Sequence, residues 1–164
     1  MDLETPPKIL CVDDEPLILE GLTRQLRRNY QVKTAVGGEA ALAVLEKESP
    51  FAVVISDMRM PGMNGAEFLK RSLKGWPDTV RMLLTGQTEL DAAISAVNEG
   101  NIFRFLTKPC APDALTSALT AAVNQYRLVT TERVLLEQTL HGSIKTLTDI
   151  LALAQPTAFG RATR

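Results

Sequence analysis

Short apolar runs alternate with segments of helical periodicity along most of the chain. Five runs have the length and composition of strands, namely Ile9–Val12, Gln31–Val36, Phe51–Ser56, Val80–Leu84 and Ile102–Thr107. The segments between them carry apolar residues three and four positions apart, which indicates amphipathic helices over residues 15–28, 39–48, 64–73 and 87–99. Strands that alternate with helices predict a parallel sheet with helices on both faces and right-handed crossovers.

Several predicted helix ends coincide with residues that favour such positions. Asn64 has a side chain suited to an N-cap, and Gly100 stands at the expected C′ position of the fourth helix. Asp14-Glu15-Pro16 also reads as an ordinary helix start, with Asp14 as the cap and proline in the first turn.

The last helix is expected to be much longer than the others. It begins near Pro112-Asp113, and a heptad phase continues from Leu115 to Ala154, where ten of twelve positions are apolar or Tyr. At about 1.5 Å per residue, this helix would be roughly 60 Å long and must project or bend. Gly142 is its expected weak point, and Pro156 is its expected end.

Composition excludes several classes of protein. The 164 residues are 45% hydrophobic, enough for a core, and 18 basic and 19 acidic residues leave a net charge of −1. Because no basic tract stands out, nothing indicates a nucleic-acid interface. Cys11 and Cys110 are isolated, the polar first eight residues do not form a signal peptide, and the apolar runs are too short for a membrane span. These observations favour a reduced, cytoplasmic, soluble protein.

Polar side chains suited to phosphoryl chemistry follow four of the predicted strands. Asp13-Asp14 follows the first strand, Asp57 the third, Thr85 the fourth and Lys108 the fifth. In a parallel α/β sheet the carboxyl ends of the strands lie along one edge, where ligands bind. We therefore expect three carboxylates, a hydroxyl and an ammonium group to meet in one cleft.

Each group has a role that fits phosphoryl transfer. Clustered acids repel one another unless a cation neutralises them, and Mg²⁺ prefers such oxygen ligands. Asp57 is the better nucleophile, because it stands alone at a strand end while Asp13 and Asp14 look like a ligand pair. Lys108 supplies a positive charge for phosphoryl oxygens, and Thr85 supplies a hydroxyl that can bond a new phosphate.

Each residue taken alone also has a simpler interpretation. Asp57 fits a turn, Thr85 before Gly86 fits a strand exit that caps the next helix, and Lys108 fits a solvated lysine before a turn. The combination at four separate strand ends favours the functional interpretation.

With these residues in place, the chain resembles the receiver domain of a two-component response regulator. The matching segments are Val12-Asp13-Asp14-Glu15, Asp57 to Gly65, Leu84-Thr85-Gly86 and Phe105-Leu106-Thr107-Lys108-Pro109. The fold expected is a doubly wound, flavodoxin-like sheet of five parallel strands in the order 2-1-3-4-5, with an extended C-terminal helix. The domain organisation expected is a receiver over residues 1–127, a signalling helix over 128–155 and a linker over 156–164.

The resemblance implies a phosphoacceptor rather than an enzyme. A sensor histidine kinase would phosphorylate Asp57. Asp14, Asp57 and the backbone carbonyl of Arg59 would bind Mg²⁺ directly, and Asp13 would assist through water. The protein would change conformation on phosphorylation and pass that change through the long helix to an output domain or a dimer partner.

The resemblance also assigns a switch and a phosphate contact. Thr85 would move toward the phosphate while the ring of Phe105 turns inward, and Lys108 would contact the phosphoryl group. The Lys108-Pro109 peptide bond would be cis. Phe105 departs from the Tyr that is commoner in the family, so the ring has no hydroxyl for a polar readout.

The tail is similar to segments that join receivers to HD-type phosphohydrolase outputs. The similarity lies in residues 140–164, especially Gly142 to Lys145 and Ala158 to Ala162. The chain has no His-Asp doublet, and His141 is its only histidine. We therefore expect a receiver with its signalling helix, from a longer regulator whose output domain is not part of this chain.

The sequence also leaves two alternative functions open and predicts one binding partner. A degenerate receiver would act only as a dimerisation scaffold. A haloacid-dehalogenase-like phosphatase also uses an Asp nucleophile, a Lys and Mg²⁺, but needs an acid two residues after the nucleophile, where Asp57 is followed by Arg59. The expected partner is a second copy of this chain, in a parallel homodimer through the seam formed by Leu136, Leu140, Leu147 and Ile150. We expect the chain to bind neither nucleic acid nor a membrane.

Overall fold

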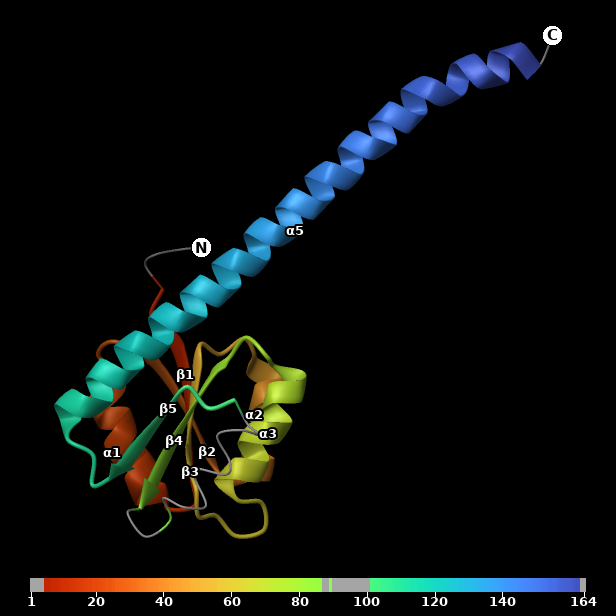
Figure 1. Cartoon of the computed structure of the whole chain (residues 1–164). Helices are drawn as coiled ribbons and strands as arrows, with labels where there is room; N and C mark the ends of the chain where they lie inside the picture. The colour runs from red at the N-terminus through yellow and green to blue at the C-terminus, as the bar shows by residue number, and fades with distance from the viewer. Residues whose placement is uncertain (1–4, 87–88, 90–100, 163–164) are drawn as a thin grey trace. The chain divides into compact units, whose positions relative to one another are not determined.

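The described residues form a five-stranded parallel sheet, as the sequence predicts (Figure 1). The computed structural model describes residues 5–86, 89 and 101–162, with side chains to residue 153. The strands are β1 (Lys8–Asp13), β2 (Gln31–Val36), β3 (Val53–Asp57), β4 (Val80–Gly86) and β5 (Arg104–Lys108). Their order is β2-β1-β3-β4-β5, so the predicted flavodoxin-like topology is confirmed.

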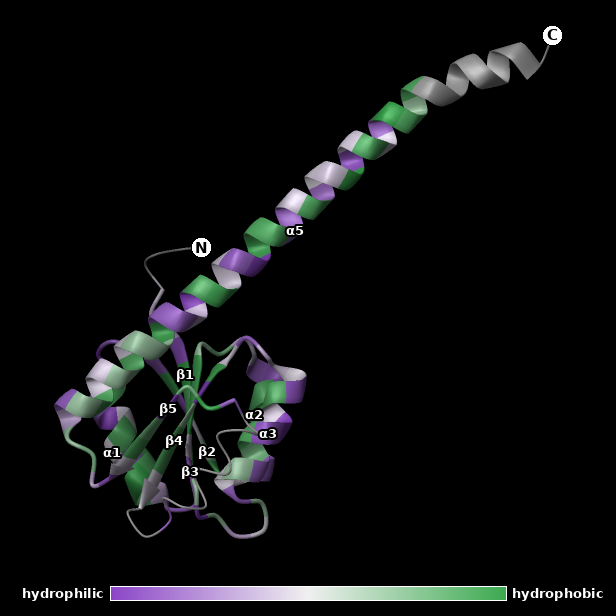
Figure 2. Cartoon of the chain, in the orientation of Figure 1, coloured by the Kyte–Doolittle hydropathy of each residue, from purple (hydrophilic) through white to green (hydrophobic). Residues whose placement is uncertain are grey.

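Helices cover both faces of the sheet and bury two apolar clusters. The helices are α1 (Pro16–Leu26), α2 (Gly38–Glu48), α3 (Gly65–Gly75) and α5 (Pro112–Ala162). One cluster joins the sheet to α1 and the first turns of α5, and includes Leu19, Met82 and Leu119. The other joins the opposite face to α2 and α3, and includes Leu45 and Phe68. Figure 2 shows the hydrophobic strands between these layers.

Helix starts follow local chemistry, with one correction. The side chain of Asn64 accepts a hydrogen bond from the Glu67 amide at 2.8 Å, so the predicted N-cap of α3 is confirmed. The N-cap of α1 is Glu15, with Pro16 in the first turn and no capping hydrogen bond from a side chain. The simpler interpretation of Asp14 as that cap is therefore wrong, because the helix begins one residue later.

The last strand and the fourth helix also differ from the sequence prediction. β5 begins at Arg104, opposite Met82 of β4, rather than at Ile102. Phe103 is 38% exposed, although its aromatic ring favoured a buried strand position. Apart from residue 89, the helix expected over residues 87–99 and its C′ residue Gly100 lie outside the described residues.

The chain divides into two compact units, residues 1–127 and 128–164. α5 runs through the boundary and continues past Gly142 and Pro156 to Ala162. The prediction that Pro156 ends the helix is therefore wrong. A proline removes one backbone donor, while the surrounding alanines and Gln155 favour helix. None of the helices in the described ranges combines the length and hydrophobicity that a membrane span requires.

Candidate functional site

Three carboxylates meet at the carboxyl ends of two neighbouring strands. Asp13 ends β1 and Asp57 ends β3, and these strands pair side by side. Asp14 follows β1, and one carboxylate oxygen of each residue lies within 4.8 Å of the others. Asp13 and Asp57 are buried and Asp14 is half-buried. The structure therefore brings together the three acids that the sequence singled out.

Lys108 reaches the same carboxylates from a strand that does not touch β3. It ends β5, which pairs only with β4 in the sheet. Its ammonium nitrogen lies 3.1 Å from Asp13 Oδ2 and 3.2 Å from Asp57 Oδ1. One cation is thus shared by two buried acids, which lowers the cost of keeping both ionised.

Burial and neighbouring charges act in opposite directions on these groups. Burial raises the pKa of Asp57 above its ordinary value, and the charge of Asp13 adds to that rise, while Lys108 lowers it without cancelling the shift. Burial alone would lower the pKa of Lys108, but its contacts with Asp13 and Asp57 outweigh burial and raise it. Without a further cation the pocket therefore carries an excess of negative charge.

The loops that carry these acids are held by backbone hydrogen bonds. The Glu15 amide donates to Asp13 Oδ1 at 3.0 Å and orients that carboxylate. The Gly65 amide donates to the Met58 carbonyl at 2.8 Å, which joins the start of α3 to the end of β3. A Cβ on Gly65 would lie 2.9 Å from Met58 Cα and closer still to the Asp57 carbonyl oxygen. Only glycine lets the backbone pass so near the phosphoacceptor candidate.

Thr85 and Phe105 lie on the strands beyond Asp57. The register pairs Asp57 with Leu84, so Thr85 is one residue further along β4 toward the carboxyl edge. Thr85 is fully buried, and its hydroxyl donates to the Gly86 carbonyl at 3.3 Å. Phe105 is half-buried and packs against the cluster that includes Phe68. The Lys108-Pro109 peptide bond is cis.

An ion pair beside the site was missed by sequence reasoning. The Arg59 side chain follows β3, and its Nε lies 2.5 Å from the Glu89 carboxylate, four residues after Thr85. The Arg59 side chain is 81% exposed, whereas that of Glu89 is 17% exposed. An acid shortly after a strand at the functional edge was the available signal, but the pairing depends on loop geometry that the sequence does not provide.

The donor set fits a hard divalent cation. It consists of carboxylate oxygens close enough to share one ion, the ligand type that Mg²⁺ prefers. Burial, and the neighbouring charge of Asp13, keep the pKa of Asp57 raised despite Lys108, so a cation bound here would favour its ionised form. Both observations agree with a magnesium site formed by Asp13, Asp14 and Asp57.

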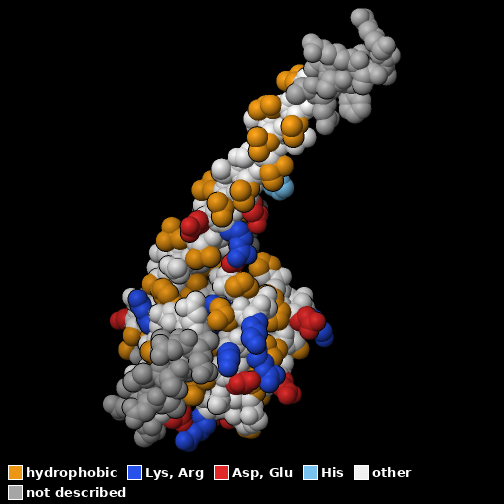
Figure 3. Space-filling view, turned by 45° about the vertical axis from the view of Figure 1, so that its right-hand side comes forward, with side chains coloured by type: hydrophobic (Ala, Val, Ile, Leu, Met, Phe, Trp, Pro, Cys, Tyr) orange, Lys and Arg blue, Asp and Glu red, His pale blue; other side chains and the backbone are white. Residues whose placement is uncertain are grey.

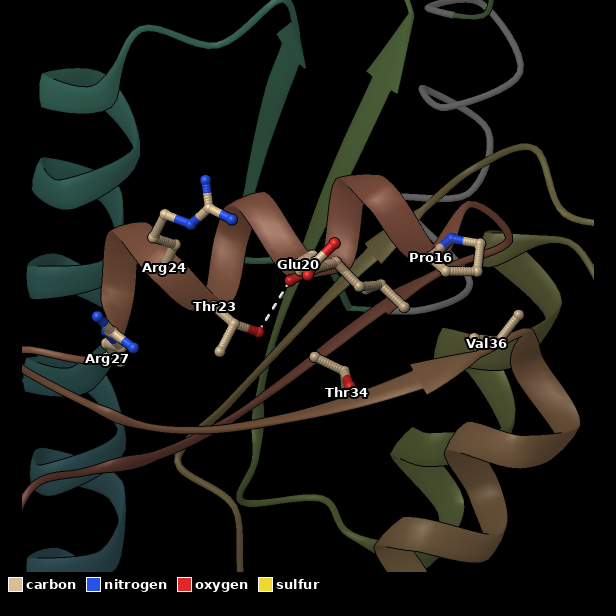
Figure 4. A pocket seen from close by; sticks show the side chains of 8 residues that line it. Pro16, Glu20, Thr23, Arg24, Arg27, Thr34 and Val36 are labelled. Carbon is tan, nitrogen blue, oxygen red and sulfur yellow. Dashed lines mark hydrogen bonds between the residues drawn. The ribbon is translucent and has the colours of Figure 1, made fainter.

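A separate pocket lies between α1 and β2, away from the carboxylates. Its volume is about 470 Å³, and its lining includes Glu20, Thr23 and Arg24 of α1, Arg27 directly after α1, and Thr34 of β2 (Figure 4). None of the acids of the cluster lines it, and nothing in its mixed polar lining points to a ligand.

The C-terminal unit carries the predicted seam on its surface. Leu136, Leu140, Leu147 and Ile150 are all exposed, and Figure 3 shows hydrophobic side chains following one another along this part of α5. The structure thus places these four residues on one helix in contact with solvent.

Comparison with known proteins gives a consistent family assignment. Residues 9–120 match the model of the response regulator receiver domain. The hydrogenase transcriptional regulatory protein HoxA of Bradyrhizobium diazoefficiens is 41% identical over 120 residues, which cover 73% of this chain and 24% of that protein. The match spans about a quarter of the length of this HoxA protein and of the HoxA protein of Cupriavidus necator.

Solved structures match almost over their whole length. A crystal structure named adenylate cyclase from Rhodopirellula baltica is 42% identical, with a TM-score of 0.77, and the match covers 80% of this chain and 98% of that one. The receiver domain of an HD domain-containing protein from Pseudomonas fluorescens is 35% identical, with a TM-score of 0.71, and the match covers 74% and 98%. The names of these relatives differ, and include a transcriptional regulatory protein, an adenylate cyclase and an HD domain-containing protein.

Proposed function

Because the chain belongs to the response regulator receiver domain family, we propose that it receives a phosphoryl group from a sensor histidine kinase onto Asp57. Receivers are signalling modules of two-component systems rather than classical enzymes. The observation that carries the proposal is the meeting of Asp13, Asp14 and Asp57 within 4.8 Å, with the Lys108 ammonium between Asp13 and Asp57.

The residues divide the work of phosphoryl transfer. A carboxylate oxygen of Asp57 attacks phosphorus, the bond from phosphorus to the kinase histidine nitrogen breaks, and an acyl phosphate forms. Lys108 holds positive charge beside the incoming phosphoryl oxygens, and the Thr85 hydroxyl moves from the Gly86 carbonyl to donate to one of them. The Asp13 carboxylate, held by the Glu15 amide, orients the Lys108 ammonium.

Mg²⁺ is the proposed cofactor. Asp14, Asp57 and the Arg59 backbone carbonyl would hold it directly, with Asp13 assisting through water. When bound, it would neutralise the carboxylates and allow an anionic donor to approach Asp57.

Transmission is proposed to run through Thr85, Phe105 and α5. Movement of Thr85 vacates space at the end of β4, and the half-buried ring of Phe105 turns inward to fill it. The change biases a two-state equilibrium of the receiver. α5, whose first turns pack in the same core as Met82 of β4, carries the bias to an output domain or to a second copy of the chain.

The output is proposed to be an HD-type phosphohydrolase. The match to the receiver of the Pseudomonas fluorescens HD domain-containing protein supports this assignment, as does the sequence similarity of residues 140–164. The match to a hydrogenase transcriptional regulator supports a transcription-regulating output as the second candidate. We propose a cytoplasmic location, in keeping with the family.

The alternatives receive less support. A degenerate scaffold has no need for the complete set of acids and Lys108. A phosphatase with Asp57 as nucleophile needs an acid at the position of Arg59, whose side chain instead pairs with Glu89.

Phosphorylation with a small donor tests the proposal. The protein is incubated with acetyl phosphate and Mg²⁺, and its intact mass is compared with that of Asp57→Asn and of wild type in EDTA. One labile phosphoryl adduct is expected on wild type with Mg²⁺ alone. An adduct that persists on Asp57→Asn would contradict the assignment of Asp57.

A second measurement separates the scaffold alternative. Mg²⁺ binding is followed by isothermal titration calorimetry in wild type and Asp14→Asn. Mg²⁺ binding by wild type without any adduct from acetyl phosphate or a histidine kinase would favour the scaffold. Steady release of phosphate from a small phosphoester would favour the phosphatase.

A further inference from the structure

The C-terminal unit carries one continuous apolar stripe. Six large side chains between residues 136 and 151 are 54 to 61% exposed: Leu136, Leu140, Ile144, Leu147, Ile150 and Leu151. At about 100° per residue, they fall within one arc of about 120° that runs for more than four turns. Ser143 is the only other residue in that arc. We call these six residues the apolar stripe.

The rest of the same helix surface is polar. The nine remaining residues between 136 and 151 are Glu137, Gln138, Thr139, His141, Gly142, Lys145, Thr146, Thr148 and Asp149. A helix that lies on an anionic membrane surface carries many Lys or Arg residues on its polar face. This face has one lysine and two acids, so its charge does not suit such a surface.

We propose that the apolar stripe binds the same stripe of a second copy of this chain, in a parallel, in-register pair of helices. Leu140 and Leu147 would form layers of one heptad position, and Leu136 and Ile150 layers of the other. Ile144 and Leu151 extend the stripe on one side. This inference deepens the proposed transmission through α5 and names its partner and geometry.

Charge favours the parallel orientation. Arg133 precedes the stripe at a seam position, with Glu132 and Glu137 on either side of it. A parallel pair in register brings each Arg133 beside the two acids of the partner helix, where interhelical ion pairs form. In an antiparallel pair that matches the heptads, with Leu136 opposite Leu147, Arg133 instead meets the apolar Ile150.

Ser143 sets the strength of the pair. It occupies the layer between Leu140 and Leu147, where a larger apolar side chain would be expected. Its small hydroxyl leaves the centre of the seam underfilled but faces the same hydroxyl of the partner in register. We therefore expect a reversible dimer that a single substitution can tighten.

Sedimentation of the full chain over a dilution series tests the partner. It is done in EDTA without a phosphodonor, so that a failure of the receiver chemistry does not affect it. Leu140→Glu with Leu147→Glu is expected to weaken the dimer about a hundredfold or more, because two charges per chain enter an apolar seam. Gln138→Glu with Thr148→Glu adds the same charge to the polar face of the same helix and serves as the control.

A substitution that strengthens the dimer shows that the effect of the Glu variants does not come from loss of the helix. Ser143→Leu is expected to tighten the dimer about tenfold, since it fills the central layer of both chains. Thr148→Leu makes a comparable change on the polar face and is expected to leave the dissociation constant unchanged.

Disulfide trapping tests the orientation. Cys11→Ala and Cys110→Ser remove the natural thiols, and Leu136→Cys is added. A parallel pair in register places the two new thiols opposite each other, so oxidation yields a covalent dimer. An antiparallel pair with Leu136 opposite Leu147 separates them by roughly 16 Å, at about 1.5 Å per residue.

The outcomes are distinct. A dimer that Leu140→Glu with Leu147→Glu dissociates, and that Leu136→Cys traps, supports the proposal. A monomer at all concentrations, or a dimer insensitive to both stripe variants, overturns the second copy as partner and leaves the stripe to an output domain. A stripe-dependent dimer that Leu136→Cys does not trap overturns the parallel register.

Discussion

Gly65→Ala tests how closely the start of α3 is packed against the phosphoacceptor strand. The added Cβ would lie 2.9 Å from Met58 Cα, and nearer still to the Asp57 carbonyl oxygen. These neighbours are backbone atoms, so no side chain can rotate away to make room. The backbone at the end of β3 or the first turn of α3 must move, and the hydrogen bond from the Gly65 amide to the Met58 carbonyl must lengthen.

The expected cost follows from two opposing effects. Overpacking costs about 1–3 kcal/mol, and contact with backbone places this site at the upper end. Alanine offsets about 1 kcal/mol through its higher helix propensity, which leaves a net loss of about 2 kcal/mol. With a urea dependence of about 1–3 kcal/mol per molar, the unfolding midpoint should fall by about 1 M.

Gly21→Ala is the matched control. Gly21 lies in the exposed middle of α1, and a Cβ there would meet nothing within 4 Å. The helix propensity gain of about 1 kcal/mol then acts alone and should raise the midpoint by roughly 0.5 M.

The assay is urea unfolding followed by the fluorescence of Trp76, which caps the end of α3. Phosphorylation by acetyl phosphate is measured in parallel and should slow in Gly65→Ala, because the moved backbone carries the Asp57 carboxylate with it. The packing argument is refuted if Gly65→Ala unfolds at the same or a higher urea concentration than wild type while Gly21→Ala gains stability.

The remaining predictions concern titration and thiol reactivity. The pKa of Asp57 lies above its ordinary value of 3.8, because burial and the charge of Asp13 together raise it more than Lys108 lowers it. Protonation of Asp57 therefore stabilises the folded state below pH 3.8, and this contribution is lost as the pH rises through the folded pKa. In EDTA, Asp57→Asn should therefore unfold at higher urea than wild type at pH 7, with no such gain at pH 3, and a wild-type advantage that grows with pH would contradict this. Burial raises the pKa of Cys11 to about 12, whereas Cys110 is only partly buried, so iodoacetamide at pH 8 should label Cys110 in the native protein and Cys11 only in urea. Peptide mapping by mass checks this order, and equal labelling of both thiols in the native state would disprove it.

Much of the fold follows from local pattern. β2 has the bounds that its sequence pattern indicates, and the Asn64 cap is present, because both depend on a few neighbouring residues. Predictions failed where a local preference met a longer-range effect. β5 starts two residues late because its pairing with Met82 sets the beginning. α5 continues past Pro156, although proline removes one backbone donor and a local pattern favours a helix end there.

The burial of Arg81 and its hydrogen bonds could not be predicted from the neighbouring sequence. Arg81 lies inside an apolar strand and is buried, and burial lowers its pKa. Its guanidinium donates to the carbonyls of Trp76 and Pro77 at 3.2 and 3.4 Å, just beyond α3. These acceptors precede Arg81 by only a few residues, yet their orientation depends on how α3 ends.

The sequence by itself determined which residues end the strands and therefore which groups share an edge, because the carboxyl ends of parallel strands meet there. Tertiary structure alone decided how those groups interact. Lys108 crosses from β5 to contact both Asp13 and Asp57, Arg59 pairs with Glu89, and Gly65 admits the backbone beside Asp57. The first two depend on distances between segments remote in the chain, which the packing of the whole sheet sets. The third depends on the path of the loop between β3 and α3, which no local pattern encodes.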